Sequence, residues 1–132
     1  METSYSRWAF KTTAAAYTLQ PEDYRHVAVE LTGSTGRNFT VPPPLSIDQG
    51  GGAYGYPLGT EIMFRQVGSG AITFVAGTGV TIAVPTDSDG TGGAGTLVSR
   101  GAGSTLKLIL RAQDLSANTS TWWLTGETVG AS

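Results

Sequence analysis

The sequence of 132 residues contains no cysteine and a single histidine. The absence of cysteine excludes disulfide bonds and every zinc site that needs a thiolate ligand. A chain of this length is expected to form one domain, and it is long enough to bury a hydrophobic core without such cross-links.

Charged residues are scarce, because Asp, Glu, Lys and Arg make up 14% of the chain, against about 25% in an average soluble domain. The net charge is −2, and the eight Lys and Arg residues form no cluster. Nucleic acids are bound by clustered cations, so we expect no nucleic-acid partner. A surface of low charge and small polar side chains suits packing against other protein. The simpler alternative is a glycine-rich β domain with long loops and no partner.

Long apolar runs are absent as well. No segment reaches the roughly 20 apolar residues that cross a bilayer. The first residues lack the basic start and apolar stretch of a signal peptide. We therefore expect no membrane partner.

Glycine is abundant, with 19 residues, and it separates short apolar stretches throughout residues 59–126. Residues 60–67, 71–75 and 80–84 alternate in polarity as half-buried strands do. Gly68-Ser69-Gly70 between the first two is predicted to be a hairpin connection. Leu106, Leu108 and Leu110 form the clearest core face. The pattern predicts an all-β fold, an antiparallel β-sandwich or barrel of about 8–9 short strands with almost no helix.

The predicted organisation is one β domain with distinctive segments. Residues 1–14 are expected to form an N-terminal arm, and residues 15–132 a single β domain. Within that domain, residues 42–58 form a Pro- and Gly-rich insertion, and residues 85–95 a flexible loop.

Motifs for cofactors and metals are weak. Residues 50–55 and 90–95 both match G-x-G-x-x-G, but neither is followed by the helix that a dinucleotide site needs. Asp87 and Asp89 could supply oxygen ligands to calcium, but the remaining ligands of a calcium loop are missing, and a solvated turn is the favoured interpretation. We expect no cofactor and no metal, with Asp87 and Asp89 as the weak calcium candidate.

Catalytic residues are not evident. A Ser-His-Asp arrangement would have to use His26, with Asp23 or Asp114 as the orienting acid. No nucleophile motif accompanies His26, and no spacing singles out a pair of carboxylates. A strand-edge histidine without a catalytic role is the favoured interpretation, so the chain is not expected to be an enzyme.

Aromatic and proline residues are the candidates for contacts with a partner. Trp122 and Trp123 are adjacent on a predicted strand, so one faces the core and the other faces away. Trp8 and Phe10 belong either to a first edge strand or to an arm that anchors on a neighbouring subunit. The predicted interface residues are Trp8, Phe10, Pro42, Pro43, Pro44, Tyr54, Tyr56 and Trp123.

With these residues in view, the chain resembles a β domain that recurs in tailed-phage virion proteins, namely capsid decoration (cement) proteins, head fibres and tail-fibre segments. The resemblance covers most of residues 15–126 and rests on the order of its pieces. The matching pieces are residues 16–19, Pro21-Glu22-Asp23, 27–31, 39–42, 57–62, 65–70, 71–82, 103–106 and 122–126. The longer stretch at residues 46–56 and the arm 1–14 depart from the pattern.

The resemblance implies a structural protein of the virion, without catalytic residues. It favours a capsid decoration protein that binds across capsid subunits, forms a homotrimer and has the major capsid protein or another virion protein as its partner. The alternative is a tail-fibre, tailspike or head-fibre module that binds host-surface glycan through exposed aromatic residues. Either function places the protein in the virion, assembled in the host cytoplasm.

Overall fold

The computed structural model describes residues 9–84 and 97–129. Helical structure in these residues consists of two short 3-10 turns, η1 (Asp23–Arg25) and η2 (Pro44–Ser46). The strands are β1 (Lys11–Thr13), β2 (Tyr17–Thr18), β3 (Val29–Leu31), β4 (Arg37–Val41), β5 (Asp48–Gly50), β6 (Ala53–Tyr54), β7 (Glu61–Gln66), β8 (Ile72–Ala76), β9 (Val80–Ala83), β10 (Thr105–Asp114) and β11 (Thr119–Gly126). The prediction of a β-rich chain with almost no helix is therefore confirmed for the described residues.

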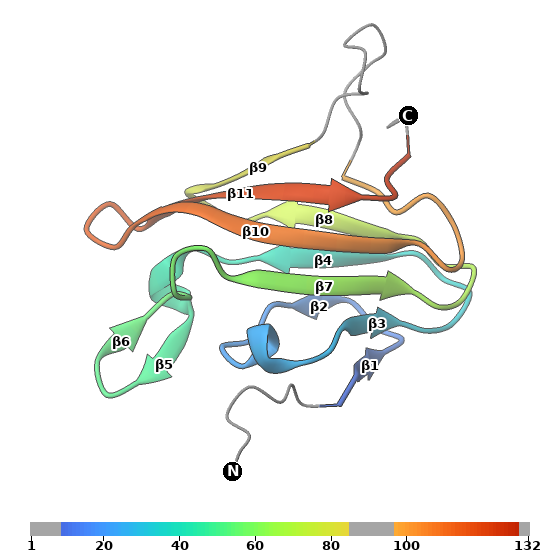
Figure 1. The fold of residues 1–132 in the computed structure, drawn as a ribbon, viewed down its shortest axis with the longest axis horizontal. Helices are drawn as coiled ribbons and strands as arrows, with labels where there is room; N and C mark the ends of the chain where they lie inside the picture. Colours follow the sequence, from blue (N-terminus) through green and yellow to red (C-terminus); the bar gives the residue numbers. More distant parts are fainter. Residues whose placement is uncertain (1–8, 85–96, 130–132) are drawn as a thin grey trace, which may run out of the picture.

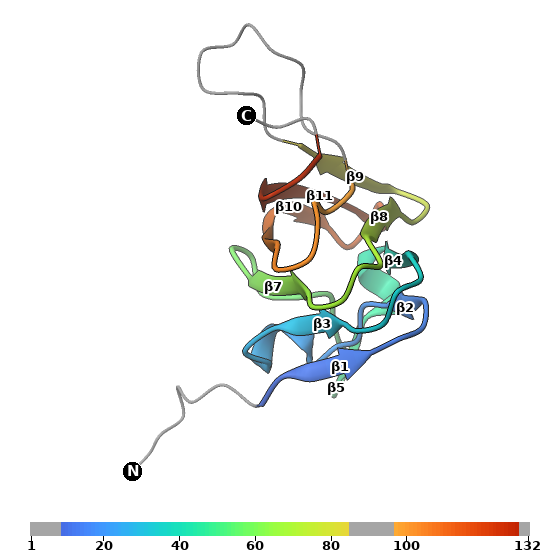
Figure 2. The ribbon, with the colours of Figure 1, turned by 90° about the vertical axis from the view of Figure 1, so that its right-hand side faces the viewer.

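Two sheets face each other across the core. The larger has the strand order β1-β3-β7-β10-β11-β9, and the smaller has the order β2-β4-β8. In Figure 1 the larger sheet lies in front of the smaller one, and Figure 2 shows the two layers from the side. The strands β5 and β6 form a separate hairpin, which projects at the lower left of Figure 1.

Half of the structure is a stack of three parallel rungs, where a rung is one strand of the larger sheet followed by one strand of the smaller sheet. The chain passes from the larger sheet to the smaller one three times, from β1 to β2, from β3 to β4 and from β7 to β8. The pairs β1–β3 and β3–β7 are parallel in the larger sheet, and β2–β4 and β4–β8 are parallel in the smaller one. Each rung therefore lies on the previous one, as in a short β-solenoid.

The second and third rungs repeat each other at a constant spacing of 35 residues. Val29 pairs with Phe64 in the larger sheet, and Phe39 pairs with Phe74 in the smaller one. The spacing is the same in both sheets, so the corner that joins them has the same number of residues in the second rung as in the third. It also aligns Gly33-Ser34 with Gly68-Ser69, which is the trace of this repeat in the sequence.

The predicted hairpin at Gly68-Ser69-Gly70 is wrong, because this segment forms a corner between the two sheets. This segment joins strands of different sheets, β7 and β8, which do not pair with each other. It stacks on the corner of the rung below, where the Gly70 N–H donates to the carbonyl of Gly33 at 3.1 Å. A side chain does not fit there, because a Cβ on Gly68 would lie 2.1 Å from the Gly33 carbonyl oxygen. The glycines permit close stacking of the rungs rather than a reversal of the chain.

Polar side chains complete this corner from inside. Gln66 is buried and donates from Nε2 to the carbonyl oxygen of Gly68 at 2.9 Å. The Ser99 hydroxyl donates to Gln66 Oε1 at 2.6 Å and accepts from the Ile72 N–H at 2.8 Å. Backbone groups that the turn leaves without ladder partners are thereby satisfied.

The other half of the larger sheet is antiparallel where β10 pairs with β7 and β11, whereas β9 runs parallel to β11 at the edge. The turn of the β10–β11 hairpin ends at Asn118, whose φ of 56° lies in the left-handed region. Asn118 Oδ1 accepts from the Leu45 N–H at 2.8 Å and so ties the hairpin to η2. The predicted antiparallel sandwich or barrel is thus not what the structure shows, because the sheets are mixed.

The core lies between the sheets and is rich in aromatic rings. Leu106, Leu108 and Leu110 are buried as predicted. Phe39 and Phe74 of the smaller sheet meet Phe64 of the larger one, with ring centroids 6.0 and 4.9 Å from that of Phe64. Edge-to-face contacts of this kind contribute beyond the apolar area that they bury.

The predicted segments have the following outcomes. Residues 11–13 of the expected arm form the edge strand β1. The insertion 42–58 holds η2, β5 and β6. The predicted flexible loop 85–95, and with it Asp87 and Asp89, lies outside the described residues, as does Trp8.

Candidate functional site

The outer face of the larger sheet carries an exposed tryptophan. Trp122 is buried and Trp123 is 45% exposed, as the alternation of a strand requires. In the register, Trp123 of β11 lies between Ile109 of β10 and Ala83 of β9. The guanidinium carbon of Arg111 lies 4.8 Å from the centroid of the Trp123 ring. This cation–π contact orders the indole at the surface.

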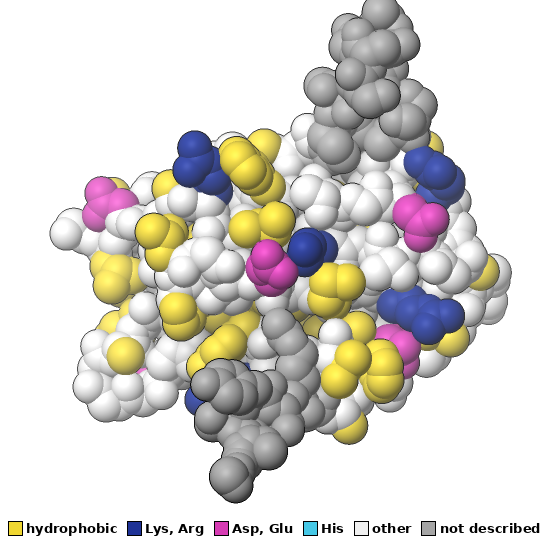
Figure 3. All heavy atoms as spheres, in the orientation of Figure 1, with side chains coloured by type: hydrophobic (Ala, Val, Ile, Leu, Met, Phe, Trp, Pro, Cys, Tyr) yellow, Lys and Arg dark blue, Asp and Glu magenta, His cyan; other side chains and the backbone are white. Residues whose placement is uncertain are grey.

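We call Met63, Ala83, Ile109, Arg111 and Trp123 the outer patch. Its border includes Lys107 and Glu61, whose Nζ and Oε1 atoms lie 3.3 Å apart. That exposed ion pair contributes little to stability, but it neutralises the charge beside the patch. Figure 3 looks onto this face and shows hydrophobic side chains interspersed with a few charged ones.

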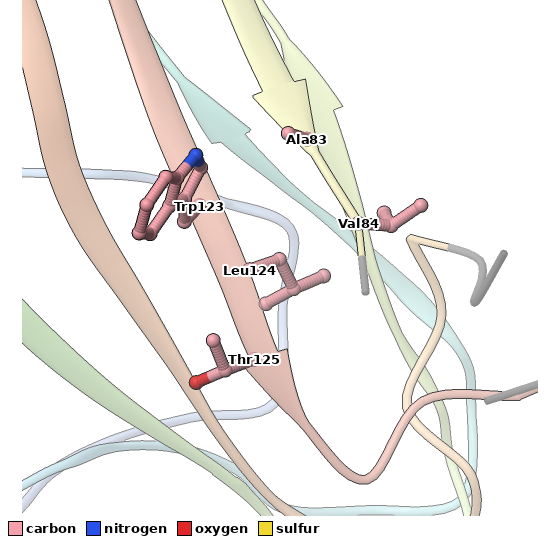
Figure 4. A pocket seen from close by; sticks show the side chains of 5 residues that line it. All are labelled: Ala83, Val84, Trp123, Leu124 and Thr125. Atoms are coloured by element: carbon pink, nitrogen blue, oxygen red, sulfur yellow. The ribbon is translucent and has the colours of Figure 1, made fainter. Parts of the chain in front are cut away.

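A small apolar hollow of about 260 Å³ adjoins the outer patch. It is lined by Ala83, Val84, Trp123, Leu124 and Thr125 (Figure 4). The pairing of β9 with β11 ends at Ala83 and Trp123. Leu124, the residue after Trp123, lines the hollow although only 1% of it is exposed.

A second hollow, which we call the tyrosine groove, lies between η1 and the β5–β6 hairpin. Its volume is about 360 Å³. It is lined by Tyr24, Arg25, Gln49, Ala53, Tyr54, Gly55, Tyr56 and Pro57. Unlike the hollow beside Trp123, it combines aromatic rings with a guanidinium and a carboxamide.

A buried carboxyl group fastens η1 to β2. Asp23 is 1% exposed. The Tyr17 hydroxyl donates to its two oxygens at 2.7 and 2.8 Å, and the Gln20 N–H donates to Oδ2 at 2.7 Å. Desolvation raises the pKa of Asp23, although the hydrogen bonds from Gln20 and Tyr17 act in the opposite direction. Burial also raises the pKa of the Tyr17 hydroxyl, and the hydrogen bond to Asp23 adds to this effect.

His26 and Glu22 join Asp23 in a cluster whose ligand atoms lie within 4.8 Å of one another. His26 Nε2 is 3.7 Å from Asp23 Oδ1, so the structure brings together one of the two His–Asp pairs that a catalytic triad would have required. Asp114 is engaged in the β10–β11 hairpin, where Oδ1 accepts from the Ala117 N–H. Because both Asp23 oxygens already accept hydrogen bonds, the cluster is best described as a structural clasp.

The clasp predicts a pH dependence of stability. A raised pKa in the folded state means that folding favours the protonated Asp23, so its contribution is fully present below 3.8, the ordinary pKa. That contribution is lost as the pH rises through the raised pKa. Asp23→Asn cannot ionise, and its free energy of unfolding should lack this decline. Urea unfolding between about pH 3 and 7 measures both slopes.

The exposed Asp48→Asn is the matched control for this measurement, because it removes the same charge from the surface. It should retain the wild-type dependence on pH. Equal slopes for the Asp23→Asn variant and the wild type would show that Asp23 titrates as it does in the unfolded chain.

The predicted interface residues fall into separate groups. Phe10, Tyr54 and Trp123 are exposed, at 52%, 39% and 45%. Pro43 is half-buried, whereas Pro42 and Pro44 are buried. Tyr56 is 2% exposed and packs edge-on against Trp122 at 5.6 Å. Tyr56, Pro42 and Pro44 therefore pack within the domain.

Several residues of the outer patch and of the tyrosine groove are not singled out by the sequence. Ile109 is an apolar residue between Lys107 and Arg111, on the side of the strand that is otherwise polar. This break in the alternation of polarity could have indicated an exposed apolar contact residue. Tyr24, Arg25 and Gln49 carry no such signal, because the groove joins two segments that are separated in the sequence.

No known protein family, curated protein or solved structure matches the chain. No helix within the described residues is long and apolar enough to cross a membrane.

Proposed function

We propose that this protein is a structural component of a tailed-phage particle, a capsid decoration protein that attaches to capsid subunits through the outer patch. The order of the sequence segments described above supports the virion. The observation that carries the mode of attachment is Trp123, which is exposed on a sheet face and held there by Arg111. Tryptophan and arginine are the residues that most often dominate the energy of protein interfaces.

The stacked rungs support a mechanical role. A decoration protein has to resist deformation where it bridges neighbouring subunits, and hydrogen bonds along both sheets and the corners link each rung to the next. The proposed assembly is a homotrimer in the virion, with the major capsid protein or another virion protein as partner. No enzymatic activity belongs to this function.

The test is binding to capsids from the phage that encodes the chain, prepared without the protein. Wild-type protein should co-sediment with these capsids. Trp123→Ala should weaken binding by about 30-fold or more, because a central aromatic anchor contributes at least about 2 kcal/mol. Leu45→Ala is the matched control, since Leu45 is exposed to a similar degree, 46%, but lies outside the outer patch.

Three outcomes would contradict the proposal. The wild-type protein could fail to bind capsids, or the Trp123→Ala variant could bind as well as the wild type. A protein that stays monomeric at high concentration in light scattering would contradict the trimer. If Trp123→Ala instead reduced adsorption of the phage to its host and left the capsid unchanged, the tail-fibre alternative would be favoured.

A further inference from the structure

The tyrosine groove is a built site rather than a chance gap between loops. One wall is η1, and the other is the β5–β6 hairpin with the segment that follows it. The hairpin side is joined to the loop that leads into η1: the Tyr56 hydroxyl donates to the carbonyl of Gln20 at 2.5 Å, and Gln49 Nε2 donates to the carbonyl of Pro21 at 2.9 Å. These bonds hold one wall to the loop that precedes the other.

The floor of the groove is fixed as well. The Gly55 N–H donates to the carbonyl of Ile47 at 2.8 Å. Gln113 Nε2 of β10 donates to the carbonyl of Tyr56 at 3.0 Å, so the groove is attached to the larger sheet. The groove therefore keeps its shape without a ligand, and a ligand would not have to order it.

The chemistry of the lining combines ring faces with planar hydrogen-bonding groups. Tyr54 is 39% exposed, and the Tyr24 ring meets Tyr56 edge-on at 6.0 Å. The exposed Arg25 stacks on Tyr24, with its guanidinium carbon 5.4 Å from the ring centroid. The bond to Pro21 uses the amino group of Gln49, and the carboxamide oxygen remains an acceptor.

This combination fits a sugar ring. A pyranose has an apolar C–H face that packs on an aromatic ring, and equatorial hydroxyls that need donors and acceptors at the rim. Arg25 and Gln49 place polar groups in the lining that an apolar ligand would not use. A phosphate ligand would find a single cation in the lining, next to Glu22 and Asp23.

We propose that the tyrosine groove binds a pyranose unit of a glycan. Its C–H face packs on Tyr54, and its hydroxyls are hydrogen-bonded by Arg25 and Gln49. This site is separate from the outer patch, and the two share no lining residue. A protein attached through the outer patch would therefore carry a second binding function.

The experiment is a two-dimensional amide NMR titration of the whole chain. The probes are the methyl pyranosides of glucose, galactose, mannose and N-acetylglucosamine, each added alone. At least one should shift the amide signals of Ala53, Tyr54 and Gly55 in a saturable way. Tyr54→Ala should weaken that binding by about tenfold or more, whereas Tyr54→Phe, which keeps the ring face, should largely preserve it.

Two further probes and one variant sharpen the test. Sorbitol has the hydroxyls of a sugar but no ring face, and it should not bind. A proline-rich peptide tests the other ligand that tyrosine-lined grooves take. Trp123→Ala should weaken capsid binding but leave sugar binding unchanged, so the two proposals fail separately. The inference is overturned if no pyranoside binds saturably, if sorbitol shifts the same signals equally, or if only the peptide binds.

Discussion

Gly68→Ala is expected to destabilise the protein by about 3 kcal/mol or more, although it adds a single methyl group. The new Cβ would lie 2.1 Å from the Gly33 carbonyl oxygen and 2.9 Å from the Gly33 backbone nitrogen. Both atoms belong to the backbone of the rung below, which cannot relieve the overlap by a change of rotamer as a side chain can. The two corners would have to separate, and the hydrogen bond from the Gly70 N–H to Gly33 would lengthen with them.

Chemical denaturation with urea measures this loss, and Gly101→Ala is its matched control. A Cβ on Gly101 meets no atom within 4 Å, and Gly101 lies outside the region of positive φ. This control should be neutral or slightly stabilising, because alanine restricts the unfolded chain. If the Gly68→Ala variant were as stable as the control, the stacked corners would not exist in solution.

Phe39→Ala is expected to lower the free energy of unfolding by about 3–5 kcal/mol. Phe39 is fully buried in the middle strand of the smaller sheet. Its ring contacts those of Tyr17, Phe64 and Phe74 at centroid distances of 5.5, 6.0 and 6.3 Å. Truncation therefore opens a cavity that touches all three rungs and both sheets.

Two variants keep this prediction specific to the aromatic cluster. Phe39→Leu retains most of the volume and should cost about 1–1.5 kcal/mol. Thr40→Ala changes the next residue, which is only half-buried, and should have a small effect. A cost for Phe39→Ala no greater than that for Thr40→Ala would mean that the two sheets do not pack through Phe39.

Strand positions and facing were predictable wherever burial alternates along the chain. Leu106, Leu108 and Leu110 face the core, and so does Trp122 but not Trp123. These assignments need only the two-residue period of a strand. The same period exposes Trp123, which is why the central residue of the outer patch could be found from the sequence.

Strand pairing was not predictable from the same pattern. A glycine-rich corner of a parallel stack and a glycine-rich hairpin have similar compositions, because both require close approach or unusual backbone angles. The pattern of Gly68-Ser69-Gly70 therefore predicts a hairpin, although β7 and β8 belong to different sheets. The repeat of Gly-Ser and Phe at a spacing of 35 residues was the signal that could have revealed the stacking.

The tyrosine groove shows the same limit at a candidate site. The aromatic character of Tyr54 predicts a contact residue, but Tyr24, Arg25 and Gln49 become neighbours of Tyr54 only when η1 packs against the β5–β6 hairpin. Tyr56, chosen on the same grounds as Tyr54, is buried because its hydroxyl reaches the Gln20 carbonyl and its ring reaches Trp122.

Composition and alternation are enough to establish the β-rich character of this protein, the low charge of its surface and the side of each longer strand that meets the core. These properties depend on local composition and on the period of a strand. Strand pairing, strand direction and the grouping of exposed side chains around a hollow become known only from the folded chain. The reason is that backbone ladders in the two directions differ little in stability, so the choice rests on long-range packing of rings and corners.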